Sequence, residues 1–450
     1  MRIDQLDIEN FRGFENINSF KLSPQFTVFI GDNCTGKTAL LDALAVGIGS
    51  LFLGFNDVDS RHIRDDEVHR ISYIKGQIPT LEPQYPVKIS CVGLIDNNYA
   101  DLLTYESRTP NLFTNTPTIS WTRELTRKGG RTTRTDASDL IDFAKKIQKK
   151  VDKGEDIILP VIAYYGTGRL WLQKRERVVK TLKPGSRMTG YIDCLDAASN
   201  QKLMLSWLKT MEIAQIQRNE PMRGLRAVKE AIANCVDYWN IVKYDLLEDD
   251  LIITSKNDEF LPFRMLSDGV RNMLAMVADI AYRTAVLNPQ LEDKAVTETP
   301  GIVLIDEIDL HLHPKWQRKV VDDLKRTFPK IQFIATTHSP FIIQSLKEGE
   351  LINLDKPEEI EEYENKSIED IGENVMGIEN IQRSERYQKM MEVAEKYYKV
   401  LQEAKSTNSQ QVQELKQKLD KLIEPYSDDV AYHAFLKMER QAAGLGDSQE

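Results

Sequence analysis

The sequence predicts a mixed α/β fold in which buried strands alternate with helices. Three observations carry this prediction. Short, fully apolar segments rich in β-branched residues occur at 26–30 and 302–305, and helical periodicity follows the first of them from Lys37 onward. Polar or glycine-containing loops come directly where these apolar segments end. Apolar runs of this length are typical of parallel strands covered on both faces.

Length and composition bound the protein class. The chain has 450 residues, of which 41% are hydrophobic, so it can form two or three domains or one large core with insertions. The longest apolar run, residues 43–55, is shorter than the ~20 residues that a membrane span needs. No signal-peptide core follows the first methionine, so a cytoplasmic protein without membrane association is expected. The cysteines include no close pair, which argues against a zinc module or a disulfide framework. They are Cys34, Cys91, Cys194 and Cys235.

The charge is unevenly distributed. The formal net charge is −10, and residues 351–450 hold 13 basic and 22 acidic residues. Residues 161–190 hold 7 basic residues and 1 acidic residue. This basic strip is expected to face a nucleotide or a nucleic acid, or else to be a solvated surface. Its members are Lys174, Arg175, Arg177, Lys180, Lys183 and Arg187.

Further elements follow from local patterns. Residues 2–8 alternate as a strand does, and residues 71–125 mix short β-rich runs with Pro and Asn, which predicts an antiparallel sheet. A charged helix is expected over 137–153 and a buried strand over 157–164. Residues 197–245 are predicted to be helical. Their expected apolar face comprises Trp207, Leu208, Ile213, Ile216, Ala227 and Ile232.

The loop after the first buried strand has the spacing of a phosphate-binding loop. Gly31-Asp-Asn-Cys-Thr-Gly-Lys37-Thr38 contains a glycine, four residues and then Gly-Lys-Thr, between a strand and a helix. Its backbone N–H groups would surround a phosphate at a helix N-terminus, Lys37 would reach the β- and γ-phosphates, and Thr38 would ligate Mg²⁺. The expected ATP-binding residues of this loop are Gly31, Asp32, Asn33, Cys34, Thr35, Gly36, Lys37 and Thr38.

Two later strand ends carry polar residues. Gly301-Ile-Val-Leu-Ile-Asp306-Glu307 is an apolar strand that ends in two carboxylates, the Walker B form. Asp306 is expected to hold Mg²⁺, and Glu307 to act as the base that activates the attacking water. His338 follows the next apolar strand and suits a γ-phosphate sensor. The pair His311 and His313 lacks carboxylate or cysteine company, so a loop role is favoured over a metal site.

A capped helix lies between these motifs. Leu266-Ser-Asp-Gly-Val270 precedes a helical run over 271–282, and Ser267 occupies the N-cap position. A serine there, with the following N–H groups, can form an anion site. On its own this segment is compatible with an ordinary capped helix.

The motif order resembles that of ABC-type ATPase heads. The opening Ile8-Glu-Asn-Phe-Arg12-Gly-Phe is similar to the RecF-like and SMC-like branch, in which the matching arginine lies near the nucleotide. Residues 306–317 and 337–340 resemble its bacterial defence members. Three further segments resemble PtuA, the ATPase of Septu and some retron anti-phage systems. They are residues 164–171, 384–390 and 434–440.

The resemblance implies an ATP-dependent mechanism. In such heads the signature serine contacts the γ-phosphate held by the opposite protomer, so Ser267 would act in trans in a homodimer or higher oligomer that sandwiches ATP, and Gly269 of the same segment is expected among the ATP-binding residues. The family's Q-loop glutamine corresponds to Gln173. Cys34 and Asp268 stand where glycine is usual, which leaves ATP and Mg²⁺ binding expected but predicts strain at Cys34 and questions fast hydrolysis.

The sequence-based hypothesis is therefore an α/β, ABC-type P-loop ATPase head with an antiparallel β-subdomain, a helical insertion and a helical C-terminal region. The expected division is an N-terminal lobe over 1–180, a helical insertion over 181–251, a C-terminal lobe over 252–350 and an acidic region over 351–450. The last region is predicted to form three amphipathic helices, at 384–404, 408–423 and 429–443.

The resemblance implies regulation of a separate HNH nuclease, PtuB-like, with the C-terminal helices as the candidate docking region or as an oligomerisation surface. The alternatives are a RecF-like or SMC-like DNA-repair ATPase, an OLD-like ATPase–nuclease and a scaffold with a degenerate ATP site. An OLD-like protein would need a Toprim carboxylate set after residue 337, and the sequence has none. The trigger, the nucleic acid cleaved, the stoichiometry and the choice between Septu and retron stay open.

Overall fold

The computed structural model describes residues 1–75, 78–95, 99, 102, 109–110, 117–169, 186–197, 201–235, 239–255, 260–356, 363 and 366–377, with 396, 414, 417–418 and 421. The chain forms two compact units, Met1–Ile371 and Gly372–Glu450, and the elements below belong to the first. Gln173 and most of the basic strip lie outside the described residues, as do nearly all of the predicted C-terminal helices. The division of the chain at residues 180, 251 and 350 stays a prediction.

A five-stranded parallel sheet forms the centre of the first unit. Its order is β15-β3-β14-β13-β9, and every neighbouring pair is parallel. The strands are β3 (Phe26–Ile30), β9 (Val161–Tyr165), β13 (Gly301–Ile305), β14 (Ile331–Thr336) and β15 (Leu351–Asn353). All residues of β3, β9, β13 and β14 are buried, as their apolar composition predicts.

Strand β9 begins four residues later than predicted. The sequence favoured a strand from Ile157, but the strand starts at Val161. The backbone N–H of Leu159 donates to the side chain of Asn288 at 2.7 Å instead of to a neighbouring strand, and Pro160 has no N–H to donate. Because of this contact with an asparagine distant in sequence, the hydrogen-bonded strand starts only at Val161.

A second, antiparallel sheet has the order β2-β1-β6-β8-β7, and β4 and β5 form a separate hairpin. The antiparallel pairing within 71–125 confirms the arrangement predicted for these residues. In the first strand, Ile3, Leu6 and Ile8 are buried, as their alternation with polar residues predicts. The strands are β1 (Arg2–Phe11), β2 (Phe14–Lys21), β4 (Arg70–Lys75), β5 (Ile78–Pro83), β6 (Val87–Leu94), β7 (Thr109–Pro110) and β8 (Pro117–Leu125).

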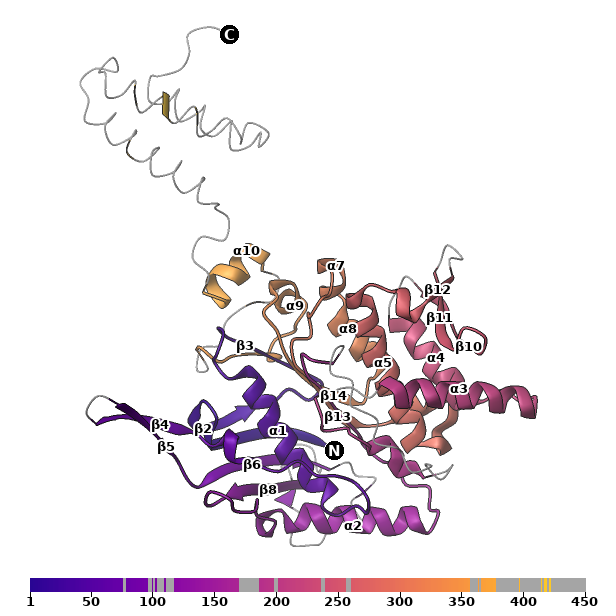
Figure 1. The fold of residues 1–450 in the computed structure, drawn as a ribbon, viewed down its shortest axis with the longest axis horizontal. Helices are drawn as coiled ribbons and strands as arrows, with labels where there is room; N and C mark the ends of the chain where they lie inside the picture. Colours follow the sequence, from indigo (N-terminus) through magenta and orange to yellow (C-terminus); the bar gives the residue numbers. More distant parts are fainter. Residues whose placement is uncertain are drawn as a thin grey trace. The chain divides into compact units, whose positions relative to one another are not determined.

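Helix α1 (Lys37–Phe52) lies between the two sheets, and Figure 1 shows it on the opposite side of the central strands from α4, α5 and α8. It is apolar on all sides, as a helix buried all round must be. A Cβ at Gly47 would lie 2.6 Å from the sulfur of Cys91, and Trp121 Nε1 donates to the Gly47 carbonyl at 2.9 Å. This glycine therefore allows α1 to pack closely on β6.

Helices lie on the other side of the central sheet, and a small antiparallel sheet packs against these helices. The bounds are α3 (Gln201–Arg218), α4 (Arg223–Cys235), β10 (Trp239–Asp245), β11 (Asp250–Ser255), β12 (Phe260–Pro262) and α5 (Asp268–Leu287). The helical prediction for 197–245 is wrong at its end, because 239–245 pairs with β11 as an antiparallel strand. Ile213 and Ile216 are also not core residues, since they are 36% and 66% exposed on the far end of α3.

The remaining helices of the first unit are α2 (Ser138–Asp152), α6 (Ala295–Glu298), α7 (Pro314–Gln317), α8 (Val320–Thr327), α9 (Pro340–Gln344) and α10 (Ile368–Asp370). Helix α2 matches the charged helix predicted over 137–153. Among the residues that the structure describes, no helix is both long and apolar enough to cross a bilayer.

Candidate functional site

The candidate site lies at the carboxyl edge of the central sheet. All five strands run in parallel, so their carboxyl ends meet at one edge, where α/β sheets commonly bind ligands. The loop 31–38 follows β3, Asp306 and Glu307 follow β13, and His338 follows β14. The two outer strands bring further polar residues to this edge, namely Arg169 after β9 and Asp355 after β15.

The phosphate-binding loop leads into α1 with an open N-terminus. Gly36 is the N-cap, with φ 97°, no side chain caps the helix, and its first turn contains no acidic residue. The N–H groups of this turn are therefore suited to an anion. Cys34 is exposed and has φ 73°, a left-handed backbone that costs energy at a residue other than glycine.

Lys37 is held within the loop. Its Nζ donates to the carbonyls of Gly31 and Asp32 at 2.7 and 2.8 Å. Burial lowers the pKa of the Lys37 ammonium, and the carboxylates of Asp355, Asp306, Glu307 and Asp32 oppose that effect. A phosphate would therefore meet a cation already positioned by the loop, and because an ammonium has three N–H donors, one remains beside these two bonds.

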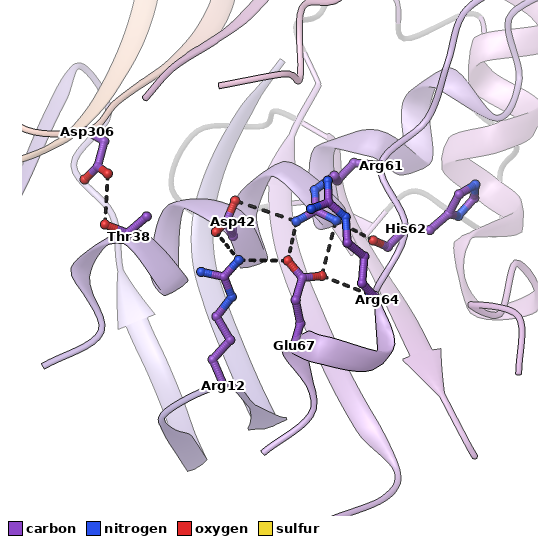
Figure 2. Close-up of polar contacts among 8 residues, drawn as sticks. All are labelled: Arg12, Thr38, Asp42, Arg61, His62, Arg64, Glu67 and Asp306. Carbon is purple, nitrogen blue, oxygen red and sulfur yellow. Dashed lines mark hydrogen bonds and ion pairs between the residues drawn. The ribbon is translucent and has the colours of Figure 1, made fainter. Parts of the chain in front are cut away.

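Thr38, Asp306 and Thr336 form a hydrogen-bonded chain between α1, β13 and β14. Thr38 Oγ1 donates to Asp306 Oδ2 at 2.8 Å, a contact drawn in Figure 2, and Thr336 Oγ1 donates to Asp306 Oδ1 at 2.7 Å. Among the described residues, no three His, Cys, Asp or Glu side chains cluster as a metal site. One hydroxyl and one carboxylate nevertheless fit Mg²⁺, which usually keeps waters and binds substrate phosphates besides few protein ligands.

Glu307 has an unusual backbone. Its φ is 47°, in the left-handed region. Its N–H donates to Thr336 Oγ1 at 2.8 Å, and its carbonyl accepts from Arg169 at 2.9 Å, so both sides of this residue are fixed. His338 is exposed at the end of β14, one residue after Thr337, whose hydroxyl donates to Asp309.

The segment 266–270 begins α5 as predicted. Ser267 is its N-cap and is exposed, and its side chain makes no capping bond. A Cβ at Gly269 would overlap the carbonyl oxygen of His311, so this glycine allows α5 to touch the loop after β13. Asp268 stands where the resemblance expects glycine and so adds a negative charge. Its carboxylate accepts from Arg271 at 2.7 Å, which partly neutralises that charge.

Arg12 is tied to α1 by carboxylates. Its guanidinium lies 2.7 Å from Asp42 and 3.0 Å from Glu67, and Arg61 also pairs with Glu67 (Figure 2). Asp42 comes one helical turn after Thr38 on α1, so Arg12 is brought near the loop. Burial raises the pKa of Asp42, and Arg12 and Arg61 counteract this. Arg12 therefore lies near the phosphate-binding loop with its guanidinium paired to Asp42 and Glu67.

Sequence reasoning missed three residues at this edge. Thr336 joins Asp306 to Glu307, Arg169 binds the backbone after β13, and Asp355 Oδ2 accepts from the N–H of Asp32 in the phosphate-binding loop at 2.8 Å. The signal for Asp355 was present, because residues 351–355 repeat the pattern of an apolar strand followed by a carboxylate. Arg187 of the basic strip is not available to a ligand, since it binds the carbonyls of Ile157 and Leu287.

The fold and this edge define a P-loop nucleotide-binding protein of the ATPase class. A family model described as "AAA domain" matches residues 5–238, more than half of the chain, and the chain therefore belongs to this AAA-domain family. A second model, described as "AAA domain, putative AbiEii toxin, Type IV TA system", matches residues 216–344.

Individual relatives resemble the chain over different lengths. It is 25% identical to the "Retron Vc95 probable ATPase" of Vibrio cholerae serotype O1 biovar El Tor, over 77% of this chain and 72% of that protein. It is 35% identical to the "Septu protein PtuA" of Bacillus mycoides (strain KBAB4), over 43% of this chain and 27% of that protein. The crystal structure of an SMC head bound to the C-winged helix domain of ScpA covers 78% of this chain and 94% of that chain, with 17% identity and a TM-score of 0.44.

Proposed function

We propose that this protein is an ATP-binding and ATP-hydrolysing ABC-type ATPase that regulates a separate HNH nuclease, PtuB-like, in a bacterial anti-phage defence complex. The observation that carries the ATPase part is the grouping of the 31–38 loop, the Thr38–Asp306 pair and Glu307 at one edge of the parallel sheet. The defence part is supported by the relatives named as retron and Septu proteins.

The residues divide the chemistry of phosphoryl transfer among them. The first-turn N–H groups of α1 and Lys37 bind the phosphates, and Thr38 and Asp306 hold Mg²⁺. When bound, Mg²⁺ supplies positive charge to the phosphate oxygens. Glu307 orients and deprotonates the attacking water, and His338, exposed at the end of β14, contacts the γ-phosphate.

An ATP sandwich between two protomers completes the site in this proposal. Ser267 caps α5 with an exposed hydroxyl that makes no capping bond, so it is available to a phosphate held by another copy. ATP would then control association of a homodimer or higher oligomer.

Two substitutions test the ATPase. Lys37→Ala removes a charge-assisted bond to phosphate, so ATP affinity should fall by about 1.5–3 kcal/mol, or roughly 10- to 150-fold. Glu307→Gln preserves size and removes the base, so it should bind ATP normally while turnover is lost. Calorimetry and phosphate release measure the two quantities. Equal ATP affinity for wild type and Lys37→Ala, or wild-type turnover by Glu307→Gln, would contradict the assignment.

Co-purification tests the partner. The protein is expressed with the HNH nuclease encoded beside it, and recovery of a stable complex is expected. Absence of an HNH gene among the neighbours, or of any complex, would favour the DNA-repair alternative, whose mark is binding to DNA junctions.

A further inference from the structure

A buried arginine joins the candidate catalytic glutamate to the helix that presents Ser267. Arg169 follows β9 and is only 4% exposed. Its Nη1 donates to the carbonyl of Asp306 at 2.6 Å, its Nη2 to the carbonyl of Glu307 at 2.9 Å, and its Nε to the side chain of Asn272 on α5 at 2.7 Å. One planar group therefore connects the loop after β9 with the end of β13 and with α5.

From this geometry we propose that Arg169 is a positioning residue that fixes the backbone of Glu307 and couples it to α5. The proposal rests on the proposed function, in which Glu307 is the base. Arg169 contacts neither the substrate nor the reacting atoms. It acts by fixing the backbone conformation of Glu307, which sets the orientation of the Glu307 side chain.

The backbone of Glu307 needs such a restraint. A left-handed residue other than glycine is strained and persists only where its surroundings determine it. Thr336 fixes its N–H and Arg169 fixes its carbonyl, on opposite sides of the residue. Loss of the bond to the carbonyl would let this peptide relax toward a commoner conformation and would turn the carboxylate away.

Two further contacts connect the same loop to α5. Asn272 Nδ2 donates to the carbonyl of Leu310 at 3.3 Å, and Gly269 lies against the backbone of His311, which itself has φ 62°. A shift of α5 would therefore move the loop that follows Glu307. In a dimer that engages Ser267, this connection would transmit engagement to the catalytic carboxylate.

An arginine is required for this role, because its rigid fork serves several acceptors in different directions and a lysine ammonium cannot span them. Arg169 Nη1 also donates to the carbonyl of Gly166 at 3.1 Å, so the fork serves three main-chain carbonyls and one side chain.

The test compares Arg169→Lys with a matched control, Arg187→Lys. Arg187 is partly buried and donates to two main-chain carbonyls and to the side chain of Asn288, so it is a similar multidentate arginine, but its partners Ile157 and Leu287 are not part of the loop after β13. We expect Arg169→Lys to reduce kcat roughly 10- to 100-fold, the range of one charge-assisted hydrogen bond, with the Kd for ATP within about twofold of wild type. Arg187→Lys should leave kcat unchanged.

Hydrogen–deuterium exchange without nucleotide gives a second measurement that does not depend on ATP turnover. Arg169→Lys should accelerate exchange in peptides covering 305–312, with no change over 26–45. If wild type shows no ATPase, the proposed function fails while this measurement still tests the positioning role. Unchanged exchange over 305–312, an unchanged kcat, or an equal effect in Arg187→Lys would overturn the proposal.

Asn272→Leu is the deciding variant if Arg169→Lys lowers the stability of the whole protein and so raises exchange everywhere. It keeps the branched shape of the side chain and removes both polar contacts through which Asn272 connects α5 to this region, the bond from Arg169 and the bond to the Leu310 carbonyl. Faster exchange over 305–312 in this variant supports the coupling. Exchange equal to wild type shows that α5 does not restrain the loop and overturns it.

Discussion

The carboxylate of Asp355 gives a sharp prediction about ATP affinity. Asp355 is exposed beyond β15, and its Oδ2 accepts from the N–H of Asp32 inside the phosphate-binding loop. Of the carboxylates that favour the charged form of Lys37 and so oppose the lowering of its pKa, Asp355 acts most strongly. A negative charge at this position repels the triphosphate that the loop is proposed to bind. Asp355→Asn removes the charge and keeps an oxygen that can accept the Asp32 N–H.

The magnitude follows from Coulomb's law. A phosphate at the first turn of α1 would lie roughly 8 Å from this carboxylate if two or three peptide units separate them. Bound Mg²⁺ leaves the nucleotide with about two net negative charges, and in water these repel one carboxylate at roughly 8 Å by about 1 kcal/mol. Screening over one Debye length of about 8 Å at physiological salt leaves about 0.4 kcal/mol. This corresponds to roughly twofold tighter ATP binding by Asp355→Asn.

Calorimetric titration of ATP at low and high salt measures the effect. The gain in affinity should shrink as salt rises, because the carboxylate is exposed. Glu348→Gln is the control, since Glu348 is an exposed carboxylate at the opposite end of β15. Equal affinity of Asp355→Asn and wild type at low salt, or a gain that salt does not reduce, would refute the reasoning.

Three other predictions concern the rest of the chain. Glu67→Gln should lower the free energy of unfolding by about 3 kcal/mol, because the carboxylate of Glu67 is only 1% exposed and pairs with two arginines. Urea unfolding measures this loss, with Asp66→Asn, a change at an exposed carboxylate, as the control. Equal losses in the two variants would contradict the prediction. Removal of residues from 384 onward should preserve ATP binding and abolish co-purification of the nuclease; retained co-purification would move the docking site elsewhere. Neutralising the strip should weaken nucleic-acid binding and flatten its salt dependence, and binding absent even at low salt would leave only a solvated surface. The strip residues to change together are Lys174, Arg175, Arg177, Lys180 and Lys183.

The fold class was accessible from the sequence where local pattern and environment agree. Strands β3 and β13 are almost entirely apolar because the sheet is covered on both faces, and the predicted runs match the observed strands to within one residue. Predictions failed where a partner distant in sequence decided the outcome. Residues 239–245 became a strand because β11 was available to pair with them, and β9 starts late because Asn288 takes the N–H of Leu159.

For the site, the sequence alone determined which residues follow each strand. The spacing of Gly31 to Thr38, the carboxylates after β13 and His338 after β14 are local features, and parallel strands bring their carboxyl ends to one edge. Only the tertiary structure decided that β14 lies between β3 and β13, so that Thr336 reaches Asp306 and Glu307. It also decided that Arg169 and Asp355 arrive from the outer strands, since strand order and hydrogen-bond partners depend on long-range packing that local pattern does not encode.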